Sequence, residues 1–476
     1  MKARNRWNVG LSIVVLIATG VALPSVMKGQ AGPGQVQGQP QVQGQGRGQG
    51  GRGGGAQQQN LPENPTAVSL PSISAEVTGP GPMYESTQSL APGKGLANFK
   101  YEAKEYFISG TANGQPYKTR LVVRKPAANS KFSGLVLVEP MHPSGSAHMF
   151  EFTSIYTMTS GHAAVDVVTG GLQQVIDSNP ERYKDLRVAQ GQTNEILAHV
   201  GSLIKSKMSG PFAGLPVRKI ILAGTSATAA MLIQYLPAHM VYRTPDMQRI
   251  YDGFLPTSNG QLIRQVDVPL VHVPTMLEIR GANLTNRPDG DAPGDQYRLY
   301  EFPGMGHVDS RDNVRLKPNP CKYALSEFPM QAYMSVALHH LFQWVDKGIV
   351  PPKADRVVKD GNGMVLDELG NPKGGIRNPY VDVAITKYAV PNDAVTPVIS
   401  NPSAYVAKGG QQAANQMCGL AAYQTDFSKE QLKQLYGSKK NYKSKVEKRI
   451  TELEKAGWSL PSYRDMVLAD ASKVEF

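Results

Sequence analysis

Short apolar runs alternate with stretches of helical periodicity from residue 134 onward. Because apolar residues fill both faces of these runs, the pattern is typical of strands buried on both sides in a parallel sheet. The runs span residues 134–140, 162–169, 218–224, 268–276 and 297–304. Apolar residues recur at helical spacing over residues 193–208, 226–236 and 330–348. Strands that alternate with helices predict an α/β fold, in which a mostly parallel sheet has helices on both faces.

The segment before these runs has the alternating pattern of antiparallel strands. Alternation starts near Asn98 and resumes after Asn113-Gly114, a dipeptide that favours a tight hairpin turn. We therefore expect two antiparallel strands at the start of the sheet.

The pattern changes after Pro351, where a hairpin around Asp360 is followed by loops and by two or three helices at the end of the chain. The twelfth position counted from Asp360 is Asn371 rather than the bidentate Glu of a calcium loop, so no calcium site is expected there. We expect an α/β core over residues 63–350 and a C-terminal extension over residues 351–476 that packs on the core.

The N-terminus has the features of an export signal. Three basic residues precede an uncharged, mostly apolar run over residues 9–23, which is short for a membrane span. Cleavage after Ala31 would remove residues 1–31, and an uncleaved N-terminal anchor is the alternative. Residues 32–62 are rich in Gly and Gln and predict a disordered linker. The chain is therefore predicted to be exported, to a periplasmic or extracellular location.

The formal net charge of +12 would be typical of a nucleic-acid-binding protein, but the positions of the charges do not favour that function. Six basic residues precede the first acidic residue, Glu63, and the rest of the chain carries +6. They are Lys2, Arg4, Arg6, Lys28, Arg47 and Arg52. Much of the remaining excess lies near residues 439–449, where acidic and basic residues interleave as on a solvated helix. No nucleic-acid partner is expected.

The chain has two cysteines, Cys321 and Cys418, without the spacing of a zinc site. In an exported protein, such a pair usually forms one disulfide. This bridge would tie the C-terminal extension to the core.

Residues 224–228 read Gly-Thr-Ser-Ala-Thr, between an apolar run and a helical stretch. The nucleophile elbow of α/β hydrolases is written Gly-x-Ser-x-Gly in that context, and its serine attacks the substrate carbonyl. Thr228 stands where the second glycine is usual. Ser226 is thus a candidate nucleophile, and a purely structural turn is the alternative.

The other members of a catalytic triad should follow in the order acid, then histidine. His307 lies in a loop after the last apolar run, where its imidazole could act as general base. Glu278 follows the preceding run and is the preferred acid. The rival acids are Asp289, Asp291 and Asp295.

An oxyanion hole requires backbone N–H donors at two places. One is the residue after the nucleophile, Ala227, and the other lies in the loop over residues 139–147, where Met141 or a neighbour could donate and Pro140 cannot. His142 and His148 could line the pocket or lie on the loop surface. The pattern implies neither a cofactor nor a metal.

From about Phe132 to the C-terminus, the sequence resembles a large set of bacterial, often exported, alpha/beta hydrolase domain proteins whose substrates are mostly undefined. The shared features, in order, are "GLVLVEPMHPSGSA", "GHAAVDVVTGGLQQV", the elbow, "DGFL", a Gly-x-x-His-x-Asp motif at 304–309, "NPCKYALSEFP", "LFQWVDKGIVPP" and "MCGLAAY". Family elbows often read Gly-x-Ser-Gln-Ser, so Thr228 is a smaller departure than the general motif indicates. The Gln after the serine is absent here, and the family's Glu-Thr-Asp appears as Met276-Leu277-Glu278.

The resemblance implies an α/β-hydrolase fold and supports pairing Cys321 with Cys418. Together with the candidate residues, it predicts an exported serine hydrolase that acts on a small-molecule carboxylic ester through Ser226, His307 and Glu278. The alternative is a binding protein of the same fold that has lost catalysis. A membrane contact is expected only through an uncleaved N-terminal segment.

Overall fold

The computed structural model describes residues 61–208, 210–281, 287–311, 313–361 and 363–476. All of them belong to one compact unit that starts at Gln57. The predicted export signal and all but the last two residues of the predicted linker lie outside the described residues. Within the described ranges, every helix is too short or too polar to cross a membrane.

A nine-stranded sheet forms the centre of the protein, in the order β11-β10-β9-β7-β5-β6-β4-β3-β2. Six of its strands run parallel to one another: β5 (Leu135–Pro140), β6 (Ala163–Val167), β7 (Lys219–Thr225), β9 (Gly253–Thr257), β10 (Leu270–His272) and β11 (Tyr297–Leu299). The antiparallel strands are β2 (Ser72–Ile73), β3 (Tyr101–Ala112) and β4 (Gln115–Pro126). The predicted α/β fold with antiparallel N-terminal strands is confirmed.

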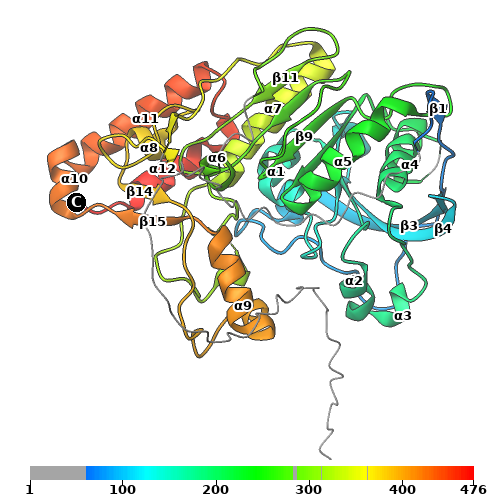
Figure 1. Ribbon diagram of the computed structural model, residues 1–476, viewed down its shortest axis with the longest axis horizontal. Helices are drawn as coiled ribbons and strands as arrows, with labels where there is room; N and C mark the ends of the chain where they lie inside the picture. The colour runs from blue at the N-terminus through cyan, green and yellow to red at the C-terminus, as the bar shows by residue number, and fades with distance from the viewer. Residues whose placement is uncertain (1–60, 209, 282–286, 312, 362) are drawn as a thin grey trace, which may run out of the picture. The chain divides into compact units, whose positions relative to one another are not determined.

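Helices cover both faces of the sheet (Figure 1). One face packs against α1 (His148–Thr159) and α7 (Met330–Lys347), and the other against α4 (Thr193–Ser206) and α5 (Ala227–Val241). Side chains of β7 alternate between the two cores, since Ile220 and Leu222 join α4 and α5 while Ile221 and Ala223 join α1 and α7. Burial on both faces explains why the strands read as continuous apolar runs.

The chain changes direction across the sheet between β5 and β7. From β5 it crosses through α1 on one face to β6, and from β7 it crosses through α5 on the other face to β9. Such a switch point leaves a crevice at the carboxyl ends of the two strands, where α/β proteins bind their ligands. The loop after β5 and the residue after β7 therefore flank the expected site.

Smaller elements connect this core. They are β1 (Thr66–Ala67), which pairs in parallel with β8 (Tyr242–Arg243), and α2 (Leu172–Ser178), α3 (Pro180–Tyr183) and α6 (Met276–Arg280). A 3₁₀ turn, η4 (Val314–Leu316), follows the loop after β11.

Residues 351–476 contain two antiparallel strand pairs and five α-helices within the described ranges. The strands are β12 (Lys359–Asp360), β13 (Gly363–Met364), β14 (Thr386–Ala389) and β15 (Tyr423–Asp426). The helices are α8 (Pro379–Asp382), α9 (Ala404–Leu420), α10 (Lys429–Tyr436), α11 (Lys439–Lys455) and α12 (Arg464–Lys473), coloured from yellow to red in Figure 1. This segment has a small apolar core of its own around Val446, Ile450 and Val467.

The structure contains the predicted disulfide between Cys321 and Cys418. Cys418 belongs to α9, which begins in the part of the extension where the sequence pattern predicts loops. That prediction is wrong because Ser403 caps the helix, its hydroxyl accepting the Val406 N–H at 3.4 Å. The bridge joins the end of α9 to the core segment that precedes α7.

Candidate active site

Ser226 lies on a sharp turn between β7 and α5. Its backbone has φ 54° and ψ −116°, which is a strained conformation for a residue with a side chain. The Ser226 N–H donates to the carbonyl oxygen of Thr257 at 3.0 Å, and the Asn259 side-chain amide donates to the Ser226 carbonyl at 3.3 Å. These bonds hold the strained backbone, and the residue remains partly exposed at the carboxyl end of β7.

Gly224 and Thr228 explain how this turn forms with one glycine instead of two. A Cβ atom at Gly224 would lie 2.4 Å from the Thr228 carbonyl oxygen, so only glycine fits there. Thr228 is 1% exposed, and its hydroxyl accepts the Thr225 N–H and donates to the Thr225 carbonyl, both at 2.9 Å. The threonine thus stabilises the turn, which accounts for the departure at the fifth position of the motif.

His307 connects the other two predicted triad residues. Its Nε2 lies 2.9 Å from the Ser226 Oγ, and its Nδ1 lies 2.5 Å from the Glu278 Oε1. The side chains of His307 and Glu278 are 9% and 11% exposed. Because a carboxylate only accepts hydrogen bonds, Nδ1 carries the proton and Nε2 can accept the Ser226 hydroxyl proton. The structure therefore brings all three residues into one hydrogen-bond chain.

Glu278 has a second task, since it also caps α6. Its Oε2 accepts the Thr275 N–H at 2.8 Å and the Thr275 hydroxyl at 2.6 Å, while Oε1 meets His307. Burial opposes the charged form, but hydrogen bonds from His307 and Thr275 outweigh it and hold the pKa of Glu278 below its ordinary value. The spacing Thr275-x-x-Glu278 is a capping-box signal that could have singled out this acid in the sequence.

The three rival acids are each occupied by arginine. Asp289 pairs with Arg356 at 2.7 Å, Asp291 pairs with Arg298 at 2.5 Å, and Asp295 pairs with Arg287. These carboxylates form ion pairs that involve the loop after α6. In the part of the chain that the structure describes, none of them is hydrogen-bonded to His307.

The backbone N–H groups of the two predicted oxyanion donors, Ala227 and Met141, have different surroundings. Ala227 is exposed and is the first residue of α5, so its N–H lies ahead of the helical hydrogen-bond ladder and at the positive end of the helix dipole. Met141 is fully buried, and its N–H donates to the Val167 carbonyl at 2.7 Å. The prediction of Met141 as a donor is wrong, because the backbone pairing of β5 with β6 continues through this residue.

The C-terminal segment supports the histidine loop directly. Val308 forms a parallel bridge with Ala421, and a Cβ atom at Gly306 would lie 2.6 Å from the Cβ of Ala422. Both alanines follow Cys418 closely, so the disulfide fixes the segment against which His307 is presented.

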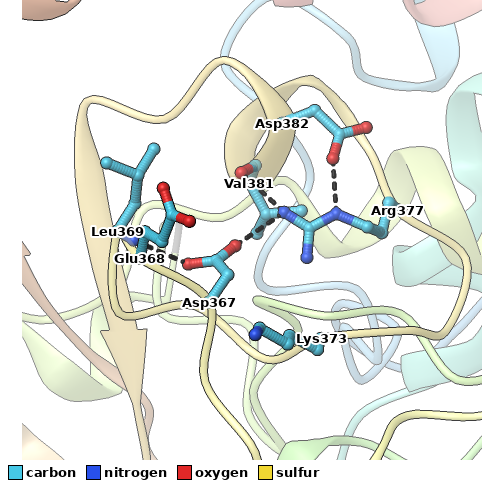
Figure 2. A pocket seen from close by; sticks show the side chains of 7 residues that line it. All are labelled: Asp367, Glu368, Leu369, Lys373, Arg377, Val381 and Asp382. Carbon is cyan, nitrogen blue, oxygen red and sulfur yellow. Dashed lines mark hydrogen bonds and ion pairs between the residues drawn. The ribbon is translucent and has the colours of Figure 1, made fainter.

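A cavity of about 250 Å³ lies in the C-terminal segment, and none of its lining residues belongs to this site. Figure 2 shows Arg377 there between two carboxylates, with Asp367 at 2.8 Å and Asp382 at 2.5 Å. Arg377 therefore links Asp367 and Asp382 through ion pairs within the C-terminal segment. Within the described ranges, three or more His, Cys, Asp or Glu side chains nowhere form a group that could hold a metal ion.

A mostly parallel sheet that presents a serine, an acid and a histidine in that chain order defines the α/β-hydrolase class. The chain belongs to the alpha/beta hydrolase domain family, whose model matches residues 68–469. This membership supports a hydrolase.

Among solved structures, the chain is similar to esterase Est22, with 12% identity, a TM-score of 0.26, and coverage of 36% of this chain and 49% of that one. The chain therefore spans about half the length of Est22. It is also similar to the zinc-bound structure of a cold-adapted esterase from an Arctic intertidal metagenomic library, with 13% identity, a TM-score of 0.24, and coverage of 42% and 83%. A putative dienelactone hydrolase from Klebsiella pneumoniae subsp. pneumoniae MGH 78578 shares 11% identity, with a TM-score of 0.26 and coverage of 43% and 85%. No curated protein matches the chain.

Proposed function

We propose that this protein is a serine hydrolase that cleaves carboxylic esters, with Ser226 as nucleophile, His307 as general base and acid, and Glu278 as the partner of His307. The observation that carries the proposal is the unbroken hydrogen-bond chain from the Ser226 Oγ through both ring nitrogens of His307 to Glu278. A purely structural turn would need neither a strained serine nor the hydrogen-bonded pair of His307 and Glu278 beside it.

The proposed reaction has two half-reactions. The His307 Nε2 takes the Ser226 hydroxyl proton while the Oγ attacks the ester carbonyl carbon, and the resulting imidazolium is stabilised by the Glu278 carboxylate. The imidazolium then protonates the departing alkoxide, which leaves an acyl group on Ser226. Water, deprotonated by His307, attacks the acyl carbon and releases the carboxylic acid and the free serine.

An ester is favoured over an amide because an alkoxide leaves more easily than an amine, so an ester asks less of the acid that protonates the leaving group. The exposed Ala227 beside the partly exposed Ser226 indicates a site that opens to solvent, as a small-molecule substrate requires. The disulfide between Cys321 and Cys418 supports an oxidising compartment and hence export.

Hydrolysis of p-nitrophenyl acetate by the purified chain tests this proposal. We expect the wild type and the surface variant Ser444→Ala to release nitrophenolate at equal rates, and Ser226→Ala and His307→Ala to lose at least about 1,000-fold in kcat. Equal activity of wild type and Ser226→Ala would remove the serine from the mechanism. Absence of ester hydrolysis by the wild type, despite binding of the ester, would favour the catalytically inactive binding protein.

A further inference from the structure

The loop after β5 uses its own backbone donors internally. The His142 N–H donates to the Ser146 carbonyl at 3.0 Å, and the Gly145 N–H donates to the His142 carbonyl at 2.7 Å. The Ser144 N–H donates to the Nδ1 of His142 at 3.1 Å. The Met141 N–H is also used, by Val167, so the four N–H groups of Met141, His142, Ser144 and Gly145 are all engaged and a side chain of this loop is a candidate for the second donor above Ser226.

His142 lies at the position where such a donor is required. β5 and β7 pair in parallel up to Val138 opposite Leu222, and extending the same count past the ends of both strands places residue 142 across from Ser226. Neighbouring strands lie about 4.8 Å apart, and both chains are here at the carboxyl edge of the sheet. His142 is partly exposed at that edge of the sheet.

The hydrogen bonds of His142 fix which ring nitrogen carries the proton. A backbone N–H can only donate, so the Nδ1 that accepts the Ser144 N–H is unprotonated and the neutral ring carries its proton on Nε2. Burial, together with the positive charge of Arg315, lowers the pKa of His142 to about 3. At neutral pH, His142 is therefore a neutral ring with Nε2–H as a donor.

A partly buried polar network holds this ring in place. The Ser144 Oγ lies 2.8 Å from the His142 Nδ1 and 3.0 Å from the His148 Nε2. The His148 Nδ1 lies 2.8 Å from the Oε2 of Glu151, which is 1% exposed and whose Oε1 accepts the backbone N–H groups of Gln88 and Ser89.

The network also contacts η4, which follows the loop that carries His307, because Arg315 donates to the Ser144 carbonyl oxygen at 2.6 Å. Such a chain of bonds leaves the ring little freedom to turn.

We propose that the Nε2–H of His142 is the second oxyanion-hole donor, with Ser144, His148 and Glu151 as positioning residues. The inference rests on the proposed serine-hydrolase function. As the Ser226 Oγ bonds to the carbonyl carbon, the π electrons of the C=O bond move to its oxygen, which accepts hydrogen bonds from the Ala227 N–H and the His142 Nε2–H. The Ser226 hydroxyl proton passes to the His307 Nε2 in this step, and neither oxyanion-hole donor gives up its proton. When the C=O bond re-forms and the alcohol leaves, both hydrogen bonds weaken again.

The test compares His142→Phe, which fills the site without a donor, with His142→Gln, which retains an N–H donor. With p-nitrophenyl acetate we expect His142→Phe to lose about 100-fold or more in kcat with KM changed less than about threefold, as for removal of one oxyanion-hole donor. The kcat of His142→Gln should be at least about tenfold higher than that of His142→Phe. Affinity for a trifluoromethyl ketone, which forms an oxyanion on Ser226, should fall in parallel with kcat across the variants.

Ser144→Ala tests the positioning role, with an expected loss of about 3- to 30-fold in kcat that His142→Phe masks when the two changes are combined. Circular dichroism and thermal unfolding identify any variant that fails to fold. If His142→Phe does not fold, the kcat values of His142→Gln and Ser144→Ala decide whether His142 acts as a donor.

If wild type hydrolyses the ester, Ser226→Ala does not, and folded His142→Phe keeps kcat within about threefold, the inference about His142 is wrong and the serine hydrolase stands. If Ser226→Ala is as active as wild type, or wild type is inactive, both proposals fail.

Discussion

Replacing Glu278 by Gln should impair catalysis through the tautomer of His307. In the wild type, Oε2 accepts two hydrogen bonds from Thr275 while Oε1 accepts from the His307 Nδ1. A glutamine has one carbonyl oxygen, and Thr275 is best satisfied when this oxygen faces it. The NH₂ group then faces His307 and donates to Nδ1, so the ring proton moves to Nε2 and the ring can no longer accept the proton of Ser226.

The size of this effect follows from the loss of the base. Stabilising the wrong tautomer of a triad histidine costs about 10³- to 10⁴-fold in kcat, which is roughly 4 to 5.5 kcal/mol in activation free energy. We expect KM for p-nitrophenyl acetate to change less than about threefold, because the substrate does not contact Glu278 in this account. Stopped assays over pH 6 to 9 with the purified variant measure both constants.

Asp291→Asn is the matched control, since it removes a carboxylate of a rival acid that pairs with Arg298 and Lys353 instead of His307. Its kcat should stay within about threefold of wild type. The reasoning is refuted if Glu278→Gln keeps more than a tenth of the wild-type kcat, or if Asp291→Asn loses as much as Glu278→Gln.

Three further results are expected. Thr228→Ala, which removes two hydrogen bonds to Thr225, should lower the free energy of unfolding by about 1 to 3 kcal/mol in urea titrations, whereas Thr228→Ser should lose less than half of that. Replacing Cys321 and Cys418 by Ala opens a link across 97 residues and should lower the free energy of unfolding by up to about 4 kcal/mol. Because the bridge supports the loop that carries His307, kcat should also fall at temperatures where the fold persists. Unchanged kcat and melting temperature would contradict this expectation. The pKa of Glu278 lies below its ordinary value of 4.5 in the folded protein, so its contribution to stability is present above pH 4.5 and is lost as the pH falls through the folded value. Wild type should therefore lose unfolding free energy more steeply than Glu278→Gln as the pH is lowered from 5 to 3, and parallel slopes would argue against the pairing.

The sequence revealed the three triad candidates because this fold fixes their order and places each one after a strand. It did not distinguish Glu278 from the rival acids by pairing, since two of the three arginines that occupy those acids come from β11 and from the segment after residue 351. The local capping box at Thr275 was available and would have favoured Glu278.

The two failures have different physical causes. Whether the Met141 N–H is free depends on how far β6 pairs along β5, and this is a tertiary property that the loop sequence does not carry. Helix α9, where the sequence pattern predicts loops, is obscured by Gly409 and by Gly410, which has φ 60° within the helix.

The network from His142 to Glu151 could be read only from the structure. His142, Ser144, His148 and Glu151 are spaced along a loop and the first turn of α1, and they come together because Gly145, with φ 93°, turns the chain back. In sequence, the same residues are typical of an exposed polar loop.

Covalent labelling by a fluorophosphonate probe, followed by intact mass measurement and peptide mapping, tests the central claim most directly. We expect wild type and Ser444→Ala each to gain one probe mass on the peptide that contains Ser226, and Ser226→Ala to gain none. Equal labelling of wild type and Ser226→Ala, or no labelling of the folded wild type, would contradict the assignment of Ser226 as the nucleophile.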